Sequence, residues 1–178
     1  MKCRFLLILY TSIAVLLGIS FPLTALDPEK SVESYVHDSW DMDDGLPQNT
    51  VTHLLQTRDG YLWAATQEGL VRFNGKTFTP VHLLDDEGHS SKFITVLFED
   101  GNGILWVGAA DGNLFKLEND EPSLVIRGGD FFSYEISCMC QRMDGSVWFG
   151  ARGGGIHLIK DGKVSSVFIP QINTNDIL

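Results

Sequence analysis

Positively charged residues are scarce in this sequence, which has 13 Lys and Arg against 23 Asp and Glu and a formal net charge of −10. It also has no cluster of Lys or Arg that could neutralise a phosphate backbone. So acidic a chain repels nucleic acid, and we exclude nucleic acid as a partner. The charge identifies no other partner, because soluble domains commonly carry a net charge.

Cysteine is also rare, with three residues in the chain. Cys138 and Cys140 are two positions apart, so in a strand they point to the same side with poor geometry for a disulfide. We expect both to be small packed hydrophobic residues. No cluster of His or Cys completes a metal site around them, and no residues have the spacing of a catalytic triad or a carboxylate pair. We therefore expect no metal, no cofactor and no catalytic residue.

The first 25 residues are typical of a secretory signal. Lys2 and Arg4 precede an apolar run from Phe5 to Phe21, and Ala25 offers a small residue for cleavage. An uncleaved membrane anchor is the alternative, but polar residues interrupt the run and a span needs about 20 mostly apolar residues. We predict a signal peptide over 1–25 and an extracytoplasmic location for residues 26–178.

No helical periodicity follows the signal; instead the sequence repeats itself. Three tryptophans lie 43 and 42 residues apart. Each has one glycine three residues before it and another six residues after it. These repeated positions are Trp63, Trp106 and Trp148, Gly60, Gly103 and Gly145, and Gly69, Gly112 and Gly154. A unit of about 40–45 residues with a glycine–aromatic signature has the period of a four-stranded propeller blade. Because the residues recur in every unit, we interpret them as structural.

The first unit shows how each blade divides into strands. Residues 50–57, 62–66, 70–73 and 77–81 are rich in β-forming residues, and Asp59-Gly60 and Asn74-Gly75 between them are strong hairpin signals. The sequence therefore predicts an all-β fold, an incomplete β-propeller.

The repeat resembles the two-component regulator propeller repeat. The likeness rests on the segments Asp44–Val51, Asp59–Trp63 and Gly69–Gly75, and it weakens in the second and third units. The resemblance implies an extracytoplasmic sensor propeller followed by a further β-domain, a membrane span and a cytoplasmic output module. That module is usually a histidine kinase, or otherwise a diguanylate cyclase. The implied partners are the remaining blades, the downstream domains and a second copy of the full-length protein.

The repeat also sets the expected boundaries of the units. We place three blades at about 43–84, 85–127 and 128–169, with a fourth beginning at about 172. Ser34–Trp40 resembles an outer strand without its own inner strands, and Asn175–Leu178 matches Asn49–Thr52. We therefore expect the chain to be an N-terminal fragment that ends within a unit.

Polar residues that differ between units are the candidates for binding a ligand. The connections into each blade and the turns after each tryptophan strand should open on one face. Their side chains would suit a small polar or carbohydrate-like ligand. The candidates are Gln48, Asn49, Gln67, Glu68, His89, Lys92, Asp111, Tyr134 and Arg152, with Ser91 and Phe132 nearby. Ordinary solvated loops are the alternative interpretation.

These observations favour an extracytoplasmic ligand-sensing module of a membrane-bound signalling protein. Two alternatives remain open: an enzyme resembling the propeller of the streptogramin lyases, and a secreted scaffold propeller without an output module. The lyases need a catalytic histidine near the propeller centre, and none of the five histidines recurs suitably. Coding sequence beyond residue 178 would separate a sensor from a scaffold.

Overall fold

The structure is a computed structural model, and it describes residues 37–129 and 134–167. The predicted signal, the start of the expected fourth unit and Phe132 lie outside these residues. The described part contains one short 3-10 helix, Met42–Asp44, and twelve strands. The strands are β1 (Val51–Gln56), β2 (Leu62–Thr66), β3 (Gly69–Phe73), β4 (Phe78–Val81), β5 (Ile94–Glu99), β6 (Leu105–Ala109), β7 (Leu114–Glu118), β8 (Glu121–Ile126), β9 (Ile136–Gln141), β10 (Val147–Ala151), β11 (Gly155–Lys160) and β12 (Lys163–Val167).

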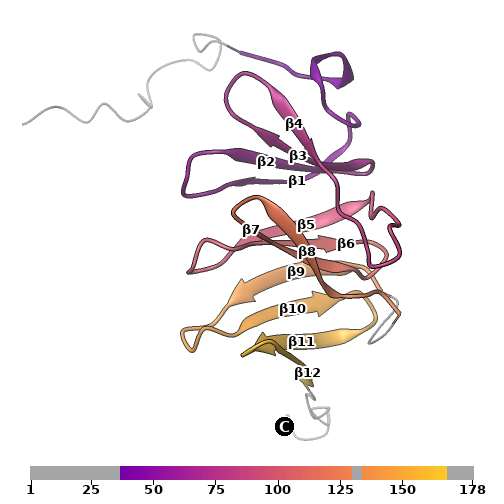
Figure 1. The fold of residues 1–178 in the computed structure, drawn as a ribbon, viewed down its shortest axis with the longest axis vertical. Coiled ribbons are helices and arrows are strands. Elements are labelled where there is room, and N and C mark those ends of the chain that lie inside the picture. The colour runs from indigo at the N-terminus through magenta and orange to yellow at the C-terminus, as the bar shows by residue number, and fades with distance from the viewer. Residues whose placement is uncertain (1–36, 130–133, 168–178) are drawn as a thin grey trace, which may run out of the picture. The chain divides into compact units, whose positions relative to one another are not determined.

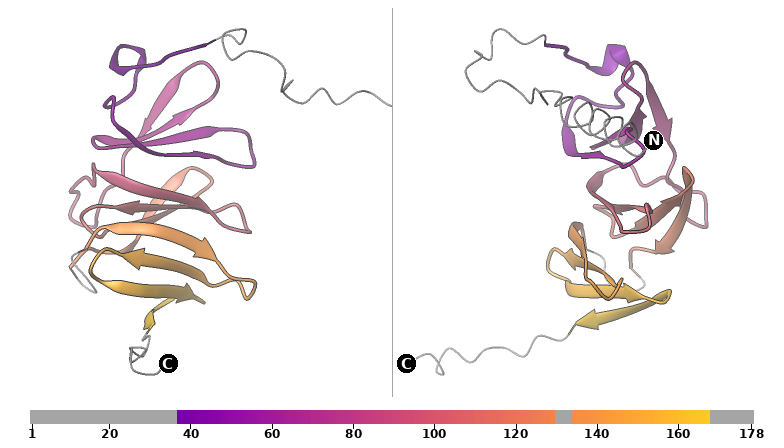
Figure 2. Two further views of the ribbon diagram at one scale, coloured as in Figure 1. Left: turned by 180° about the vertical axis from the view of Figure 1, so that it is seen from behind. Right: turned by 90° about the vertical axis from the view of Figure 1, so that its left-hand side faces the viewer.

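Consecutive strands form three antiparallel four-stranded sheets, which we call the first (β1–β4), second (β5–β8) and third (β9–β12) sheets. Figure 1 and both views of Figure 2 show them side by side, and their inner strands are in contact, β1 with β5 and β5 with β9. The three sheets do not close into a ring. The predicted all-β propeller architecture is thus confirmed. No helix among the described residues is long and apolar enough to cross a membrane.

The glycine that precedes each tryptophan strand makes the predicted hairpin possible. Gly60, Gly103 and Gly145 have φ of 93°, 82° and 81°, a region that favours glycine. Each donates its backbone N–H to a carbonyl three residues earlier, at 2.8–3.1 Å. The glycine six residues after each tryptophan does not have the same place in every turn. A two-residue turn joins Thr66 to Gly69, so Gly69 begins β3. Three residues separate Ala151 from Gly155, so Gly154 lies inside the turn.

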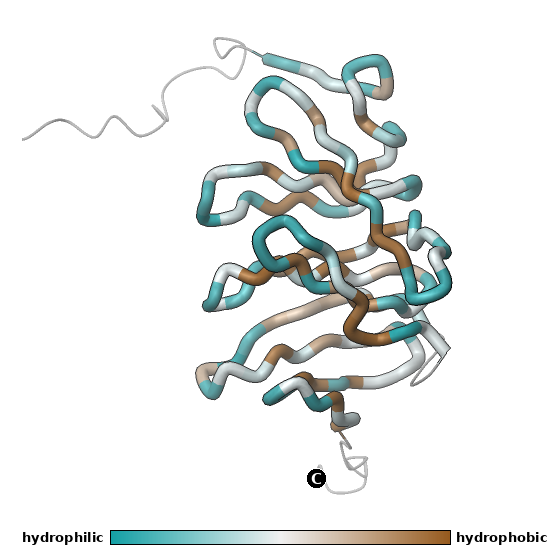
Figure 3. Tube along the Cα trace, in the orientation of Figure 1, coloured by the Kyte–Doolittle hydropathy of each residue, from teal (hydrophilic) through white to brown (hydrophobic). Residues whose placement is uncertain are grey.

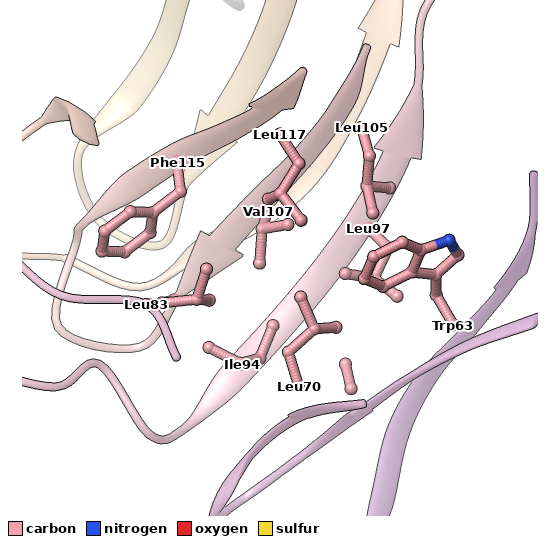
Figure 4. Close-up of a cluster of buried hydrophobic side chains, with 11 residues drawn as sticks. Trp63, Leu70, Leu83, Ile94, Leu97, Leu105, Val107, Phe115 and Leu117 are labelled. Atoms are coloured by element: carbon pink, nitrogen blue, oxygen red, sulfur yellow. The ribbon is translucent and has the colours of Figure 1, made fainter. Parts of the chain in front are cut away.

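Hydrophobic residues follow the strands and polar residues the turns, as Figure 3 shows, and the core lies between successive sheets. Trp63 and Leu70 of the first sheet pack with Leu97, Leu105 and Leu117 of the second (Figure 4). A second cluster joins the second and third sheets in the same way, and includes Trp106, Leu114, Ile136, Val147, Phe149 and Ile159. Burial of apolar area between the sheets therefore holds them together.

The three tryptophans occupy equivalent positions but differ in burial. Trp63 is 2% exposed and Trp106 6%, and both belong to the clusters between sheets. Trp148 is only partly buried, because no further sheet covers it among the described residues. Each indole N–H donates to a side chain of its own hairpin, Thr57, Asp100 or Ser146, at 2.9–3.1 Å. Their predicted structural role is therefore seen directly in the first two units.

Glycine lets the inner strands approach closely. A side chain at Gly108 would meet the Ile136 Cγ2 and Val96 Cγ1 atoms at 2.8 Å. Ile136 begins β9, so the second and third sheets touch at this point. Ala65 and Gly150 occupy the equivalent positions in the other sheets. The repeated small residue is thus required by the packing of one sheet on the next.

The predicted outer strand at Ser34–Trp40 is not formed over residues 37–40, where the chain belongs to no strand. Each of the three described sheets already has its own fourth strand, β4, β8 or β12, so none of them lacks the outer strand that this segment would supply. Trp40 instead packs against Phe73 and Phe78, with ring centroids 5.0 and 6.5 Å away. Leu46 packs on the same side of the first sheet. Residues 34–36 lie outside the described residues.

The hairpin before β10 predicts a dependence of stability on pH. The Asp144 carboxylate accepts hydrogen bonds from the Ser146 hydroxyl (2.6 Å) and the Lys160 ammonium (3.1 Å), and these lower its pKa. A carboxylate whose pKa is lowered by folding stabilises the folded protein at pH values above the ordinary aspartate pKa of about 4. This stabilisation is lost as the pH falls below that value and through the pKa of the folded state. Asp144→Asn should therefore destabilise the protein at neutral pH and progressively less below about pH 4.

Urea unfolding between pH 2.5 and 7 measures this difference, with Asp161→Asn in the β11–β12 turn of the same sheet as the control. A stability difference between Asp144→Asn and the unchanged protein that stayed constant over the whole range would show that the carboxylate contributes nothing through its charge.

Candidate functional site

The candidate residues gather along one edge of the three sheets, on the right in Figure 1. We call this the loop edge; it consists of the β2–β3, β6–β7 and β10–β11 turns and the connections that lead into β1, β5 and β9. This is the arrangement expected from the sequence, because in each sheet both kinds of segment end at the same side. The individual residues nevertheless form several local groups and not one pocket.

Two candidates from neighbouring sheets form an ion pair. Glu68, in the turn after β2, lies 3.2 Å from the ammonium of Lys92, which precedes β5. Both side chains are more than half exposed, so the pair is accessible to a ligand. An exposed pair of this kind contributes little stability, which leaves its charges available for binding.

Asp111 belongs to a more buried network. Its carboxylate accepts hydrogen bonds from the Ser91 hydroxyl (2.7 Å) and the Asn113 amide (3.1 Å). Asn113 also donates to Ser91 (2.8 Å) and accepts from the backbone N–H of Gly128 (2.7 Å). The network therefore links the connection into β5, the β6–β7 turn and the chain after β8. Its polar groups satisfy one another, which favours a structural role.

Tyr134 and Arg152 lie together at the third sheet. The Arg152 guanidinium is 3.3 Å from the Glu135 carboxylate, and its backbone N–H donates to the Glu135 carbonyl at 2.8 Å. The Tyr134 side chain lies beside Gly153 and is 48% exposed. An exposed ring beside the turn that carries Arg152 is a suitable surface for a sugar ring or another flat polar group.

The remaining candidates are engaged in local turns. The Gln48 side chain accepts from the Thr50 backbone N–H at 2.5 Å, and that of Asn49 from the Met42 N–H at 3.0 Å. His89 lies 3.2 Å from Asp85, whose pKa is lowered chiefly by the backbone N–H of His89. Gln67 is exposed at the tip of its turn. The assignment of these residues to a ligand site stays a prediction.

The opposite edge, formed by the β1–β2, β5–β6 and β9–β10 turns, carries clefts that the sequence did not indicate. A cleft of about 390 Å³ lies between the first two sheets, and one of about 260 Å³ lies at the equivalent place between the second and third. The first is lined by Arg58, Asp59, Glu99 and Asp120, whereas the second is lined by Asp100, Lys116, Lys160 and Asp161. Their linings differ because these positions vary between units.

His157 is buried: it is 4% exposed, and its ring nitrogens lie 2.9 Å from the Gly154 carbonyl and 3.0 Å from the Ser166 hydroxyl. One expectation, about the two cysteines, is wrong. Cys138 and Cys140 are exposed free thiols, not packed residues, because no further sheet covers this side of β9 in the described part of the chain.

Two segments of the chain, residues 45–68 and 88–111, match the model of the two component regulator propeller family. Two segments of the chain are thus similar to the repeat of this family, as the resemblance predicted. Comparison with curated proteins gives no significant match.

Solved structures share the fold. The extracellular domain described as part of the hybrid two component system BT4673 of B. thetaiotaomicron superposes with a TM-score of 0.65 at 22% identity, over 76% of this chain and 19% of that one. Virginiamycin B lyase from Staphylococcus aureus gives a TM-score of 0.58 at 18% identity, over 72% and 44%. The chain therefore spans about a fifth of the first structure and less than half of the second.

Proposed function

We propose that this chain is an extracytoplasmic ligand-sensing propeller segment of a membrane-bound bacterial signal-transduction protein. A histidine kinase or diguanylate cyclase would follow it, and the full-length protein would act as a dimer. The observation that carries the proposal is the match of two repeats to the regulator propeller family, on a chain that folds into successive four-stranded sheets. The extracellular domain with the same fold supports the location.

The location can be tested by fusion to alkaline phosphatase, which is active only outside the cytoplasm. A fusion after residue 167 should be active in a bacterial host, because Lys2, Arg4 and the apolar run after them form an export signal. The same fusion without residues 1–25 should be inactive. Equal activity with and without these residues would contradict an export signal in this segment.

The ligand in this proposal is a small polar or carbohydrate-like molecule bound at the loop edge. Tyr134 supplies an exposed ring, while Arg152, Lys92 and Glu68 supply charged hydrogen-bonding groups on the same edge. Such a combination of one apolar surface with a few polar groups is typical of small-molecule sites.

A screen of neutral and acidic mono- and disaccharides by thermal shift would identify a ligand. We expect Tyr134→Ala and Arg152→Ala each to weaken the affinity for that ligand at least about tenfold, since each removes a direct contact. The weaker binding would appear as a smaller thermal shift at the same ligand concentration. Asn102→Ala, at the opposite edge, is the matched control. If Asn102→Ala abolished the shift and both loop-edge variants preserved it, the site would lie in the clefts of the opposite edge.

A further inference from the structure

The connection from β4 to β5 contains a tight turn that gathers three side chains able to bind a metal ion. The turn is closed by the Asp85 N–H, which donates to the His89 carbonyl at 2.9 Å, and Gly88 within it has a φ of 83°. Asp85, Glu87 and His89 each direct one ligand atom to the same place, and these three atoms lie within 4.8 Å of one another. The turn joins the first and second sheets, both of which are four-stranded in the structure.

The three ligand atoms are spaced as they would be around a zinc ion. The Nδ1 atom of His89 lies 3.2 Å from Oδ2 of Asp85 and 3.5 Å from Oε2 of Glu87. In a tetrahedral zinc site with bonds of about 2.0–2.1 Å, neighbouring ligand atoms lie about 3.3 Å apart. An ion placed between the three atoms therefore requires only small movements of the side chains, together with loss of any proton on Nδ1.

Backbone hydrogen bonds hold the Asp85 carboxylate in this position. Its Oδ1 atom accepts from the N–H groups of Glu87 (2.9 Å) and His89 (2.8 Å), so that Oδ2 faces the imidazole ring. The Asp85 side chain is 12% exposed, whereas those of Glu87 and His89 are 60% and 74% exposed. The fold thus fixes one ligand, and the other two can adjust around an ion that remains open to water.

The charges around the turn match a divalent cation. Asp85, Asp86 and Glu87 contribute three negative charges, and Arg127 contributes one positive charge through its contacts with Glu87 (2.8 Å) and Asp86 (3.7 Å). Arg127 contacts the Oε1 atom of Glu87, which leaves Oε2 beside His89. With a neutral imidazole, the net charge of about −2 is the charge that a divalent ion neutralises.

We propose that Asp85, Glu87 and His89 bind a zinc ion, with water as the fourth ligand. One imidazole nitrogen and two carboxylate oxygens suit zinc, whereas calcium takes six to eight oxygen ligands. The proposal departs from the expectation of no metal, because only the folded turn brings these three side chains to one place. It does not depend on the ligand proposed for the loop edge.

Isothermal titration calorimetry with zinc chloride tests the site in the purified protein without a histidine tag. All three cysteines are replaced by serine, because thiolates also bind zinc. We expect one zinc ion per chain, and at least about tenfold weaker binding of calcium and magnesium, which prefer sites made of oxygen ligands alone. Absence of zinc binding, or binding of calcium as tight as that of zinc, would overturn the proposal.

Single variants of this protein identify the ligands. His89→Ala and Glu87→Gln should each weaken zinc binding at least about tenfold, because a second-shell change alone typically costs that much and these changes remove direct ligands. The matched controls are His82→Ala, at an exposed histidine of the same connection, and Asp86→Asn, which removes an exposed carboxylate that pairs with Arg127. Both controls should bind zinc at least about threefold more tightly than either ligand variant. Equal losses in His82→Ala and His89→Ala would contradict the proposed ligand set.

NMR spectra of the histidine rings locate the ion without a ligand variant. During the zinc titration, the imidazole signals of His89 should shift or broaden, while those of His82 and the buried His157 should stay in place. Changes shared equally by all five histidines, or confined to histidines other than His89, would overturn the proposal.

Discussion

Replacing Trp63 by alanine should lower the free energy of unfolding by about 3–5 kcal/mol, the usual cost of removing a large buried aromatic side chain. The Trp63 side chain is 2% exposed and fills the space between the first sheet and Leu105 and Leu117 of the second. Its indole N–H also bonds to the Thr57 hydroxyl at 3.1 Å, which would be left without this partner. Urea unfolding followed by circular dichroism measures the change.

Trp148→Ala is the matched comparison, because this tryptophan has the same position in its repeat but is only partly buried. Its replacement should cost clearly less. Equal losses at Trp63 and Trp148 would mean that contact with the following sheet does not determine the contribution of the repeated tryptophan.

Replacing Gly108 by leucine should separate the second and third sheets. Even a Cβ atom at this position would approach Ile136 to 2.8 Å, so the inner strand of the third sheet must move. Overpacking of this kind typically costs about 1–3 kcal/mol, and we expect the upper part of that range because Ile136 is completely buried.

Gly150→Ala provides a control at the equivalent position of the third sheet. A Cβ atom there would meet the Cys138 sulfur at 2.7 Å, but that side chain is exposed and can rotate away. The control should therefore be nearly neutral. A Gly108→Leu variant as stable as the unchanged protein would show that the two inner strands are not in close contact.

The repeat made the architecture predictable because it fixes the strands and turns by local chemistry. The strand predicted at 62–66 is formed over those residues, and Gly60 adopts the positive φ that its hairpin requires. Trp63 could be assigned to the core because residues that recur in every unit are those that build the unit.

Contacts between segments that are distant in the sequence could not be predicted from it. The Arg72 guanidinium lies over the Tyr61 ring, 4.4 Å from its centroid, and pairs with Asp120 of the second sheet. Within the second sheet, Asn113 bonds to Ser91 and to the chain after β8. Neither follows a repeated pattern, because such contacts depend on which turns and connections meet in space, and these differ from unit to unit.

The candidate site was predicted only in outline. The sequence placed its residues on one edge, but it could not show that Gln48 and Asn49 are engaged in their own turns. Nor could it show that the clefts lie at the opposite edge, since a cleft forms where neighbouring turns leave a gap and not where a motif occurs.

The central claim is that the repeated residues join successive sheets, and nuclear Overhauser effects between labelled side chains test it most directly. We predict cross-peaks from the Trp63 indole to the Leu105 and Leu117 methyl groups and from the Ile136 methyl groups to the Gly108 Hα, all of which connect neighbouring sheets. Cross-peaks confined to residues of one sheet, with none between Trp63 and the second sheet, would contradict the account.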